Sequence, residues 1–313
     1  MEYYKSVTVY LGSGGKVKDH YRDTVKDFVK LAKQKEVSIV YGGMCAGTMG
    51  VLADTCLDLG VEITGVVPRN IKDFTILHPT LKEQDKLVLT DDMWERKKEM
   101  VARGDAAIIF PGGYGTLDEL FEFLYWGMAG YHDKPCVLIN ENGYWSPIIS
   151  FIQKSVDQGL VGRRVLDMLI SVEDTDKVFD QLDSWHKEHH NPEFDPDIFT
   201  QGNDYLGRIE IGNMEATSDP IIVSSPNMES TYKLANALVL KQLNKITRAI
   251  GVLDKNPTMN HLQDWIKIAV REKFITPNCA QLIIFEDDEA RLTDRLARHK
   301  HISSDLREKW DNT

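Results

Sequence analysis

The stretch that decides the fold is Ala106-Ala107-Ile108-Ile109-Phe110-Pro111-Gly112-Gly113-Tyr114-Gly115-Thr116-Leu117-Asp118-Glu119. It begins with an apolar run, passes through a glycine-rich turn and continues into a helical pattern. A run that is apolar on both faces is typical of a parallel strand covered by helices on each side. Glycines let the backbone approach a ligand, and the free amides at a helix N-terminus suit a phosphate. The stretch therefore predicts a strand, a phosphate-binding loop and a helix, in that order.

The same alternation extends over residues 5–182, where short β-branched runs alternate with longer amphipathic segments. This pattern predicts βαβ units, and hence an α/β fold whose parallel sheet is covered by helices on both faces. The expected strands are 6–11, 37–41, 62–67, 86–89, 106–110, 136–139 and 168–171. The expected helices are 21–34, 48–58, 93–103, 116–129, 147–158 and 175–187.

A second, smaller unit is expected after this region, because single cores rarely grow beyond about 250–300 residues and the chain has 313. The polar, proline-containing segment 185–202 indicates a linker. We place the boundary near Asn191, with a nucleotide-binding domain at 1–190 and a C-terminal domain at 191–313. The second unit is predicted to be α/β or α+β, and we find no internal repeat in the sequence. Its expected elements are strand 220–224, helix 232–250, helix 261–273, strand 281–285 and helix 286–299.

Charge and composition exclude several classes of function. The formal net charge is −11, which disfavours electrostatic binding of nucleic acid or of an anionic membrane over a broad surface. Apolar runs fall far short of the ~20 residues that span a bilayer, and the N-terminus shows no apolar signal region. The four cysteines form no CxxC pair, so neither a disulfide framework nor a zinc site is indicated. We expect a cytoplasmic protein with a small-molecule ligand.

Two further glycine-rich loops follow predicted strands, at residues 12–15 and 42–50. In open parallel sheets ligands bind beyond the carboxyl ends of the strands, where all three loops would meet. Neither loop carries a GxGxxG followed by a ribose-binding acid at the expected distance, so a redox dinucleotide is weakly supported. Together the three loops indicate a nucleotide-sized ligand.

Charged residues near these loops are open to two interpretations. Glu119 lies about one turn into its helix, where a carboxylate can face a ligand or simply interact with the helix dipole. Arg96 and Lys97 can supply cations to an anionic ligand, or can belong to an ordinary solvated helix face.

With these segments side by side, the chain resembles the LOG family of cytokinin riboside 5′-monophosphate phosphoribohydrolases, often labelled lysine decarboxylases. The match to PGGxGTxxE at residues 111–119 carries the resemblance, together with Glu95-Arg96-Lys97 preceded by Met93. Further matches in the family's order are Tyr41-Gly42-Gly43 with Gly47 and Met49-Gly50, Gly65-Val66-Val67-Pro68, and Lys134-Pro135 with Asn140, Gly143 and Tyr144. The resemblance covers roughly residues 5–185.

The resemblance implies a Rossmann-like fold and hydrolysis of a nucleoside 5′-monophosphate, AMP or an N6-modified AMP, to free base and ribose 5-phosphate. It implies neither metal nor redox cofactor, and it implies a homodimer or higher homo-oligomer. Arg96 and Glu119 would be the catalytic pair, with Arg96 keeping Glu119 ionised. Glu119 would act as nucleophile, base or electrostatic stabiliser. The residues that would bind the phosphate and the rest of the nucleotide are Ser13, Gly43, Met93, Lys97, Gly112, Gly113, Gly115 and Thr116.

Some features depart from the family pattern or lie outside it. Trp94 stands where many members have His, Met44 where they have a third Gly, and Leu11 where they often have Cys. The first two could reshape the base pocket, so the base that is released is left open. An alternative is a carrier on the same fold, like molybdenum cofactor carrier proteins, that holds a ligand without cleaving it. For the C-terminal unit we expect a role in regulation or oligomerisation.

Overall fold

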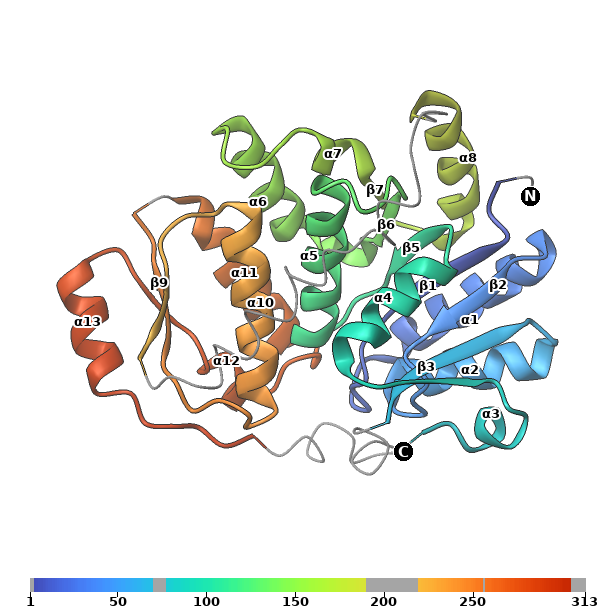
Figure 1. The fold of residues 1–313 in the computed structure, drawn as a ribbon, viewed down its shortest axis with the longest axis horizontal. Helices are drawn as coiled ribbons and strands as arrows, with labels where there is room; N and C mark the ends of the chain where they lie inside the picture. Colours follow the sequence, from blue (N-terminus) through green and yellow to red (C-terminus); the bar gives the residue numbers. More distant parts are fainter. Residues whose placement is uncertain (1–2, 70–76, 190–218, 256, 305–313) are drawn as a thin grey trace.

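The computed structural model describes residues 3–69, 77–189, 219–255 and 257–304. Its main feature is a seven-stranded, all-parallel sheet with the strand order β4-β3-β2-β1-β5-β6-β7 (Figure 1). The predicted parallel α/β sheet is confirmed. The strands are β1 (Ser6–Tyr10), β2 (Ser38–Tyr41), β3 (Ile63–Pro68), β4 (Leu87–Thr90), β5 (Ala106–Ile109), β6 (Cys136–Ile139) and β7 (Leu169–Val172).

Helices cover both faces of this sheet. Alternate residues of one strand point to opposite faces, so Ile108 packs in one apolar cluster and Ala107 with Ile109 in the other. Helices α1, α2 and α8 supply side chains to the Ile108 cluster, and α4 to α7 supply the other. The helices are α1 (Asp19–Lys35), α2 (Gly47–Leu59), α3 (Pro79–Glu83), α4 (Met93–Arg103), α5 (Tyr114–Met128), α6 (Ser146–Asp157), α7 (Arg164–Met168) and α8 (Val178–His189).

The order of the strands places a topological switch between β1 and β5. The chain winds outward from β1 through β2 to β4 on one side, and through β5 to β7 on the other. At such a switch two neighbouring loops diverge and leave a crevice at the carboxyl ends of the strands. Gly12 N donates to Pro111 O at 3.3 Å across this point. The predicted phosphate-binding loop therefore lies where this topology favours ligands.

The C-terminal unit is a second parallel sheet, of three strands in the order β10-β9-β8, so its class is α/β. The sequence predicts one helix over 232–250, but the helix ends at Gln242 and a strand begins at Ile250, because Asn244 turns the chain with a φ of 56°. The short helices α3, α7 and α12 were not predicted. The elements are β8 (Ile221–Val223), α10 (Met228–Gln242), β9 (Ile250–Leu253), α11 (Asn260–Arg271), α12 (Pro277–Ala280), β10 (Ile284–Glu286) and α13 (Glu289–Ala297).

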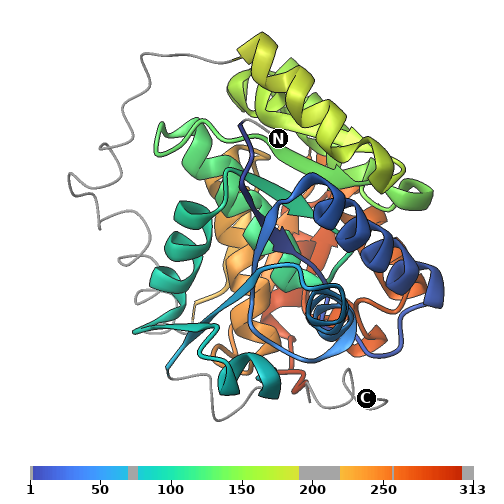
Figure 2. The same ribbon diagram turned by 90° about the vertical axis from the view of Figure 1, so that its right-hand side faces the viewer.

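One apolar core joins the two units. In Figure 1, α10 and α11 lie between the C-terminal strands and helices α5 and α6, and α10 packs on α5 while α11 packs on α6. Figure 2, turned by 90°, shows the C-terminal helices behind the main sheet. Trp265 of α11 stacks on Trp145 with ring centroids 5.8 Å apart. The predicted boundary near Asn191 lies outside the described residues and stays a prediction.

Candidate active site

The glycine-rich loop after β5 leads directly into the N-terminus of α5. Gly113 is the N-cap residue, and no side chain caps the helix there. The first amides of α5 therefore keep their hydrogen-bonding capacity for a ligand. A Cβ at Gly112 would lie 2.1 Å from Thr116 Oγ1, so only glycine lets the loop fold over Thr116, whereas Gly115 is exposed to open space. The loop thus offers backbone donors, and the buried Thr116 hydroxyl lies beside it.

Helix α4 brings Arg96 to this loop. The helix begins after Asp92, whose Oδ1 accepts from Glu95 N at 2.8 Å, and one turn later Arg96 points into the interior with only 8% of its surface exposed. Its Nε donates to Val66 O at 3.0 Å, and its Nη1 lies 3.3 Å from Glu119 Oε1. The structure thus joins the two residues that the sequence predicted as a catalytic pair, across 23 positions of the chain.

Burial, rather than Arg96, dominates the ionisation of Glu119. Loss of water around the carboxylate raises the pKa of Glu119 to about 7, although Arg96 and Lys97 lower it. Arg96 lowers the pKa of Glu119, as the sequence predicts, but burial outweighs this effect and Arg96 does not hold the carboxylate at an ordinary pKa. A carboxylate that titrates near neutrality can change its protonation state during a reaction cycle, which is a common property of catalytic acids and bases.

Lys97 faces a second set of charges. Its Nζ lies 2.6 Å from Asp118 Oδ2 and 3.0 Å from Glu122 Oε2, and all three side chains are buried. Burial alone lowers the pKa of Lys97, but the two carboxylates outweigh it and the net pKa is raised. The ammonium is thus held between α4 and α5, behind the Arg96–Glu119 pair. Nucleotide binding by Lys97 stays a prediction.

The other predicted residues lie around the Arg96 guanidinium and the β1 loop. Met93 Sδ is 3.5 Å from Arg96 Nη1. The half-buried Ser13 packs its backbone against Gly47, where a Cβ would approach its carbonyl carbon to 2.5 Å. Gly43 has a φ of +75° and packs against Val67. Its described contacts therefore show a glycine that the turn requires. Binding of a nucleotide by Ser13, Gly43 and Met93 stays a prediction.

Two aromatic residues that sequence reasoning did not place in the site support its loops. Tyr144 donates its hydroxyl to Gly112 O at 2.5 Å and so fixes the glycine-rich loop after β5. Phe274, from the C-terminal unit, lies against Gly12, where a Cβ would meet its ring at 2.7 Å. Tyr144 was noticed only as part of the family pattern, and nothing near Phe274 in the sequence points to the site.

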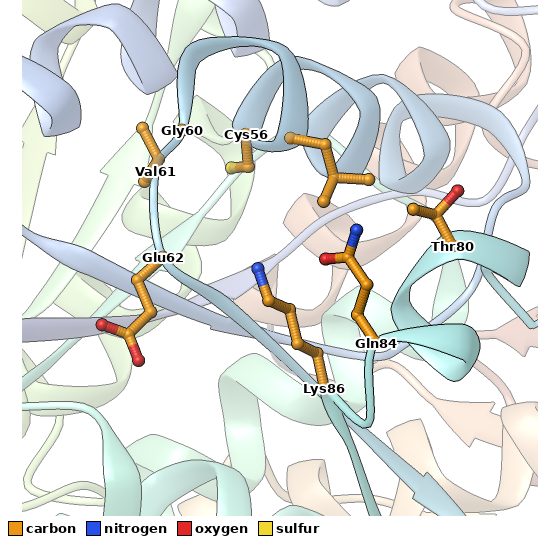
Figure 3. Close-up of a pocket in the computed structure, with 8 residues that line it drawn as sticks. Cys56, Gly60, Val61, Glu62, Thr80, Gln84 and Lys86 are labelled. Atoms are coloured by element: carbon orange, nitrogen blue, oxygen red, sulfur yellow. The ribbon is translucent and has the colours of Figure 1, made fainter.

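A separate hollow of about 410 Å³ is shown in Figure 3. It lies between α2, α3 and the starts of β3 and β4, and Lys86 and Gln84 are among its lining residues. This is the amino end of the strands, opposite to the edge at which α/β sheets bind ligands. We assign it no function.

Comparison with known proteins places the chain in a family. A family profile described as "possible lysine decarboxylase" matches residues 49–182. A cytokinin riboside 5′-monophosphate phosphoribohydrolase of Arabidopsis thaliana is 33% identical over 182 residues, which are 58% of this chain and 78% of that protein. A probable enzyme of the same name from Oryza sativa subsp. japonica is 33% identical over 186 residues, or 59% of this chain and 87% of that protein. The chain belongs to the LOG family.

Membership in the LOG family agrees with the fold and supports a hydrolase at the level of the family, since these relatives are named phosphoribohydrolases. Among solved structures, the molybdenum cofactor carrier protein of Chlamydomonas reinhardtii is similar with a TM-score of 0.43 and 14% identity, covering 58% of this chain and 98% of that one. A molybdenum cofactor binding protein of Rippkaea orientalis has a TM-score of 0.42 and 16% identity, covering 57% and 95%. No helix in the described part of this LOG-family chain has both the length and the apolar character needed to cross a membrane.

Proposed function

We propose that this chain hydrolyses the N-glycosidic bond of a nucleoside 5′-monophosphate, AMP or an N6-modified AMP of the cytokinin type, and releases the free base and ribose 5-phosphate. The observation that carries the proposal is the buried Arg96–Glu119 pair beside the uncapped N-terminus of α5. The names of the relatives, which act on such nucleotides, support the choice of substrate class.

The residue types suit this reaction. The bond between C1′ and the base nitrogen breaks, the base keeps the electron pair and takes a proton, and a water oxygen forms the new bond to C1′. Positive charge builds on the sugar as the bond breaks, and a carboxylate at Glu119 would stabilise that charge. The same carboxylate could instead attack C1′ or take the proton from the incoming water. Arg96 orients Glu119 through the 3.3 Å contact.

The phosphate would anchor the substrate away from the reacting bond. The amides at the start of α5 and the Thr116 hydroxyl would bind it, and the helix dipole favours a dianion there. Binding energy gained at the phosphate can be used to orient the sugar over Glu119. We therefore expect AMP to be a much better substrate than adenosine.

The test is a panel of nucleoside monophosphates with chromatographic detection of the free base. Wild type should release base from an adenine nucleotide, while Glu119→Gln and Arg96→Ala should lose activity by at least about a hundredfold. If wild type releases base from no member of the panel, the proposal fails. Recovery of an intact, bound ligand together with no hydrolysis would favour a carrier. A cytoplasmic location and a homo-oligomer remain parts of the proposal.

A further inference from the structure

The C-terminal unit repeats the second half of the main fold without a gap. Helix α5 spans Tyr114–Met128 and α10 spans Met228–Gln242, so each residue of α10 lies 114 positions after its counterpart. The same interval separates β6 from β9 and α6 from α11, and the bounds of both pairs match residue for residue. The strand pairing follows the same interval. Ala107 of β5 pairs with Cys136 of β6, and 114 positions later Ile221 of β8 pairs with Ile250 of β9.

The turns between these elements match as well. Gly130 and Asn244 are 114 positions apart and have φ values of 86° and 56°; Gly159 and Lys273 have 70° and 66°. Asn140 N donates to Val172 O at 2.7 Å. The equivalent Asp254 N donates to Glu286 O, also at 2.7 Å. Left-handed backbone is uncommon outside glycine, yet Asn244 and Lys273 adopt it where the first copy has glycine, which indicates one shared fold. The expectation of no internal repeat therefore does not hold for the fold.

The two copies pack on each other through equivalent surfaces. Helix α5 packs on its counterpart α10, and α6 on its counterpart α11. The segment before α6 contacts α11 through the stacked Trp145 and Trp265, and the segment before α11, the 3₁₀ turn Pro257–Met259, contacts α6 in return. Such reciprocal contacts are the mark of a two-fold interface between like subunits.

The second copy keeps the fold of the phosphate loop but not its chemistry. Asn227 stands at the position of Gly113 and caps α10 with its own side chain, accepting from Ser230 N at 2.8 Å. Lys233 stands at the position of Glu119. The helix N-terminus that is open in the first copy is therefore closed in the second, and the catalytic carboxylate is replaced by a cation.

A direct link runs from the second copy to the back of the proposed site. The buried Tyr232 of α10 donates its hydroxyl to Glu122 Oε1 at 2.7 Å. Glu122 Oε2 lies 3.0 Å from Lys97 Nζ, which in turn bonds Asp118, the neighbour of Glu119 in the chain. Lys97 itself is the neighbour of Arg96. The chain of contacts thus starts in the second copy and ends beside both members of the pair.

We propose that residues 220–296 are a catalytically silent second copy of residues 106–182, which serves the first copy as a built-in two-fold partner and, through Tyr232, positions helix α5 and its carboxylates. A homo-oligomer of this chain would then use a face other than α5 and α6. Tyr232 is a positioning residue, because it acts through Glu122 and Lys97.

The experiment compares full-length wild type, Tyr232→Phe and Thr231→Val. Thr231 is the control, since it is buried on the same helix but donates within that helix, to Asn227 O at 2.7 Å. We expect Tyr232→Phe to lower kcat about tenfold with little change in KM, because a hydrogen bond to a buried charged group is lost. It should also speed hydrogen exchange of the amides of residues 114–128, whereas Thr231→Val should affect only α10.

The two readouts keep this inference separate from the proposed function. The kinetic arm rests on that function, and the exchange arm does not. If wild type releases no base, the proposed function fails while exchange in α5 still decides the role of Tyr232. Thr231→Val should leave exchange in residues 114–128 at the wild-type rate. If Tyr232→Phe does the same, the second copy does not position α5 and the inference is overturned. Faster exchange together with unchanged kcat would overturn the catalytic part of it.

Discussion

At the scale of single residues, the proposed chemistry depends on one contact, between Arg96 and Glu119. The two side chains are nine-tenths buried and meet through a single 3.3 Å approach. Burial of a carboxylate in this way favours its neutral form more than one guanidinium favours the charged form. Glu119 is therefore held near its titration point, with a pKa of about 7.

Activity should follow the ionisation of Glu119. An ionised carboxylate is needed to stabilise positive charge on the sugar, so kcat/KM should fall about tenfold per pH unit below the pKa and reach a plateau above it. With a pKa of about 7, the fall should begin near neutrality. A pH–rate profile checks this, and a limb near pH 4.5, the pKa of an ordinary glutamate, would contradict it.

Stability should change with pH in the opposite direction. The folded-state pKa of Glu119 lies above its unfolded value, so its favourable contribution is complete below about pH 4.5 and is lost as the pH rises through about 7. The substitution Glu119→Gln removes the ionisable carboxylate and with it this pH-dependent loss of stability. It should therefore raise the free energy of unfolding by on the order of 2 kcal/mol at pH 8. Denaturant titrations at pH 5 and pH 8 measure it. An equal effect at both pH values would show that the carboxylate is not destabilised by burial.

The sequence predicted that Arg96 and Glu119 form a pair but did not predict the surroundings of that pair. Arg96 and Glu119 fall within a motif, whereas Tyr144 and Tyr232 reach the site from 32 and 110 positions away from their partners. Asp118 and Glu122 lie one turn apart on a helix, and this spacing is a local sign in the sequence that both can pair with one cation, here Lys97. The competition between burial and Arg96 could not be judged without knowing how deep Glu119 lies.

At the scale of elements, α5 and α10 show how one residue opens or closes a helix N-terminus. Both have the same length and the same relation to the preceding strand. Gly113 leaves the first amides of α5 available, while Asn227 occupies those of α10.

The substitution Gly113→Asn would give α5 the side-chain cap that Asn227 gives α10. Its side chain should satisfy the amides that the phosphate needs, so KM for AMP should rise at least about tenfold, while the cap adds a few tenths of a kcal/mol to stability. Steady-state kinetics and thermal unfolding test both effects. Asn227→Ala is the control, and should cost about 1 kcal/mol with no effect on KM. An unchanged KM in Gly113→Asn would place the phosphate elsewhere.

Periodicity located most elements because each buried helix or strand shows its own apolar pattern. It failed at β9, because apolar residues recur among polar ones from Tyr232 to Ile250 with no Gly or Pro between the helix and the strand, and only Asn244 marks the turn. The repeat was missed for a similar reason. The equivalent positions keep apolar character and turn geometry but rarely the same residue, so Gly130 corresponds to Asn244 and Phe151 to Trp265.

At the scale of the whole molecule, the second half of the main fold and the C-terminal unit form one body. Their helices share a continuous apolar core, in which Trp145 and Trp265 are fully buried and stacked. The helix pair α5–α6 covers one face of the pair α10–α11, and α10–α11 covers one face of α5–α6 in return. The C-terminal unit thus covers α5, the helix whose N-terminus forms part of the proposed site.

This arrangement predicts one cooperative unfolding transition for the whole chain. Trp265→Ala should lower stability by about 3–5 kcal/mol and shift the single transition, because the cavity opens in the shared core. Calorimetry shows whether this holds. Two separate transitions, with only one of them moved by Trp265→Ala, would mean that the units fold independently.

The central claim is that the Arg96–Glu119 site cleaves the glycosidic bond of a nucleoside monophosphate. The most direct measurement is the incubation of AMP with wild type and with Glu119→Gln, followed by quantification of adenine and ribose 5-phosphate. The account predicts equal amounts of the two products with wild type and almost none with the variant. AMP that stays intact with wild type, or adenine released equally by both proteins, would contradict it.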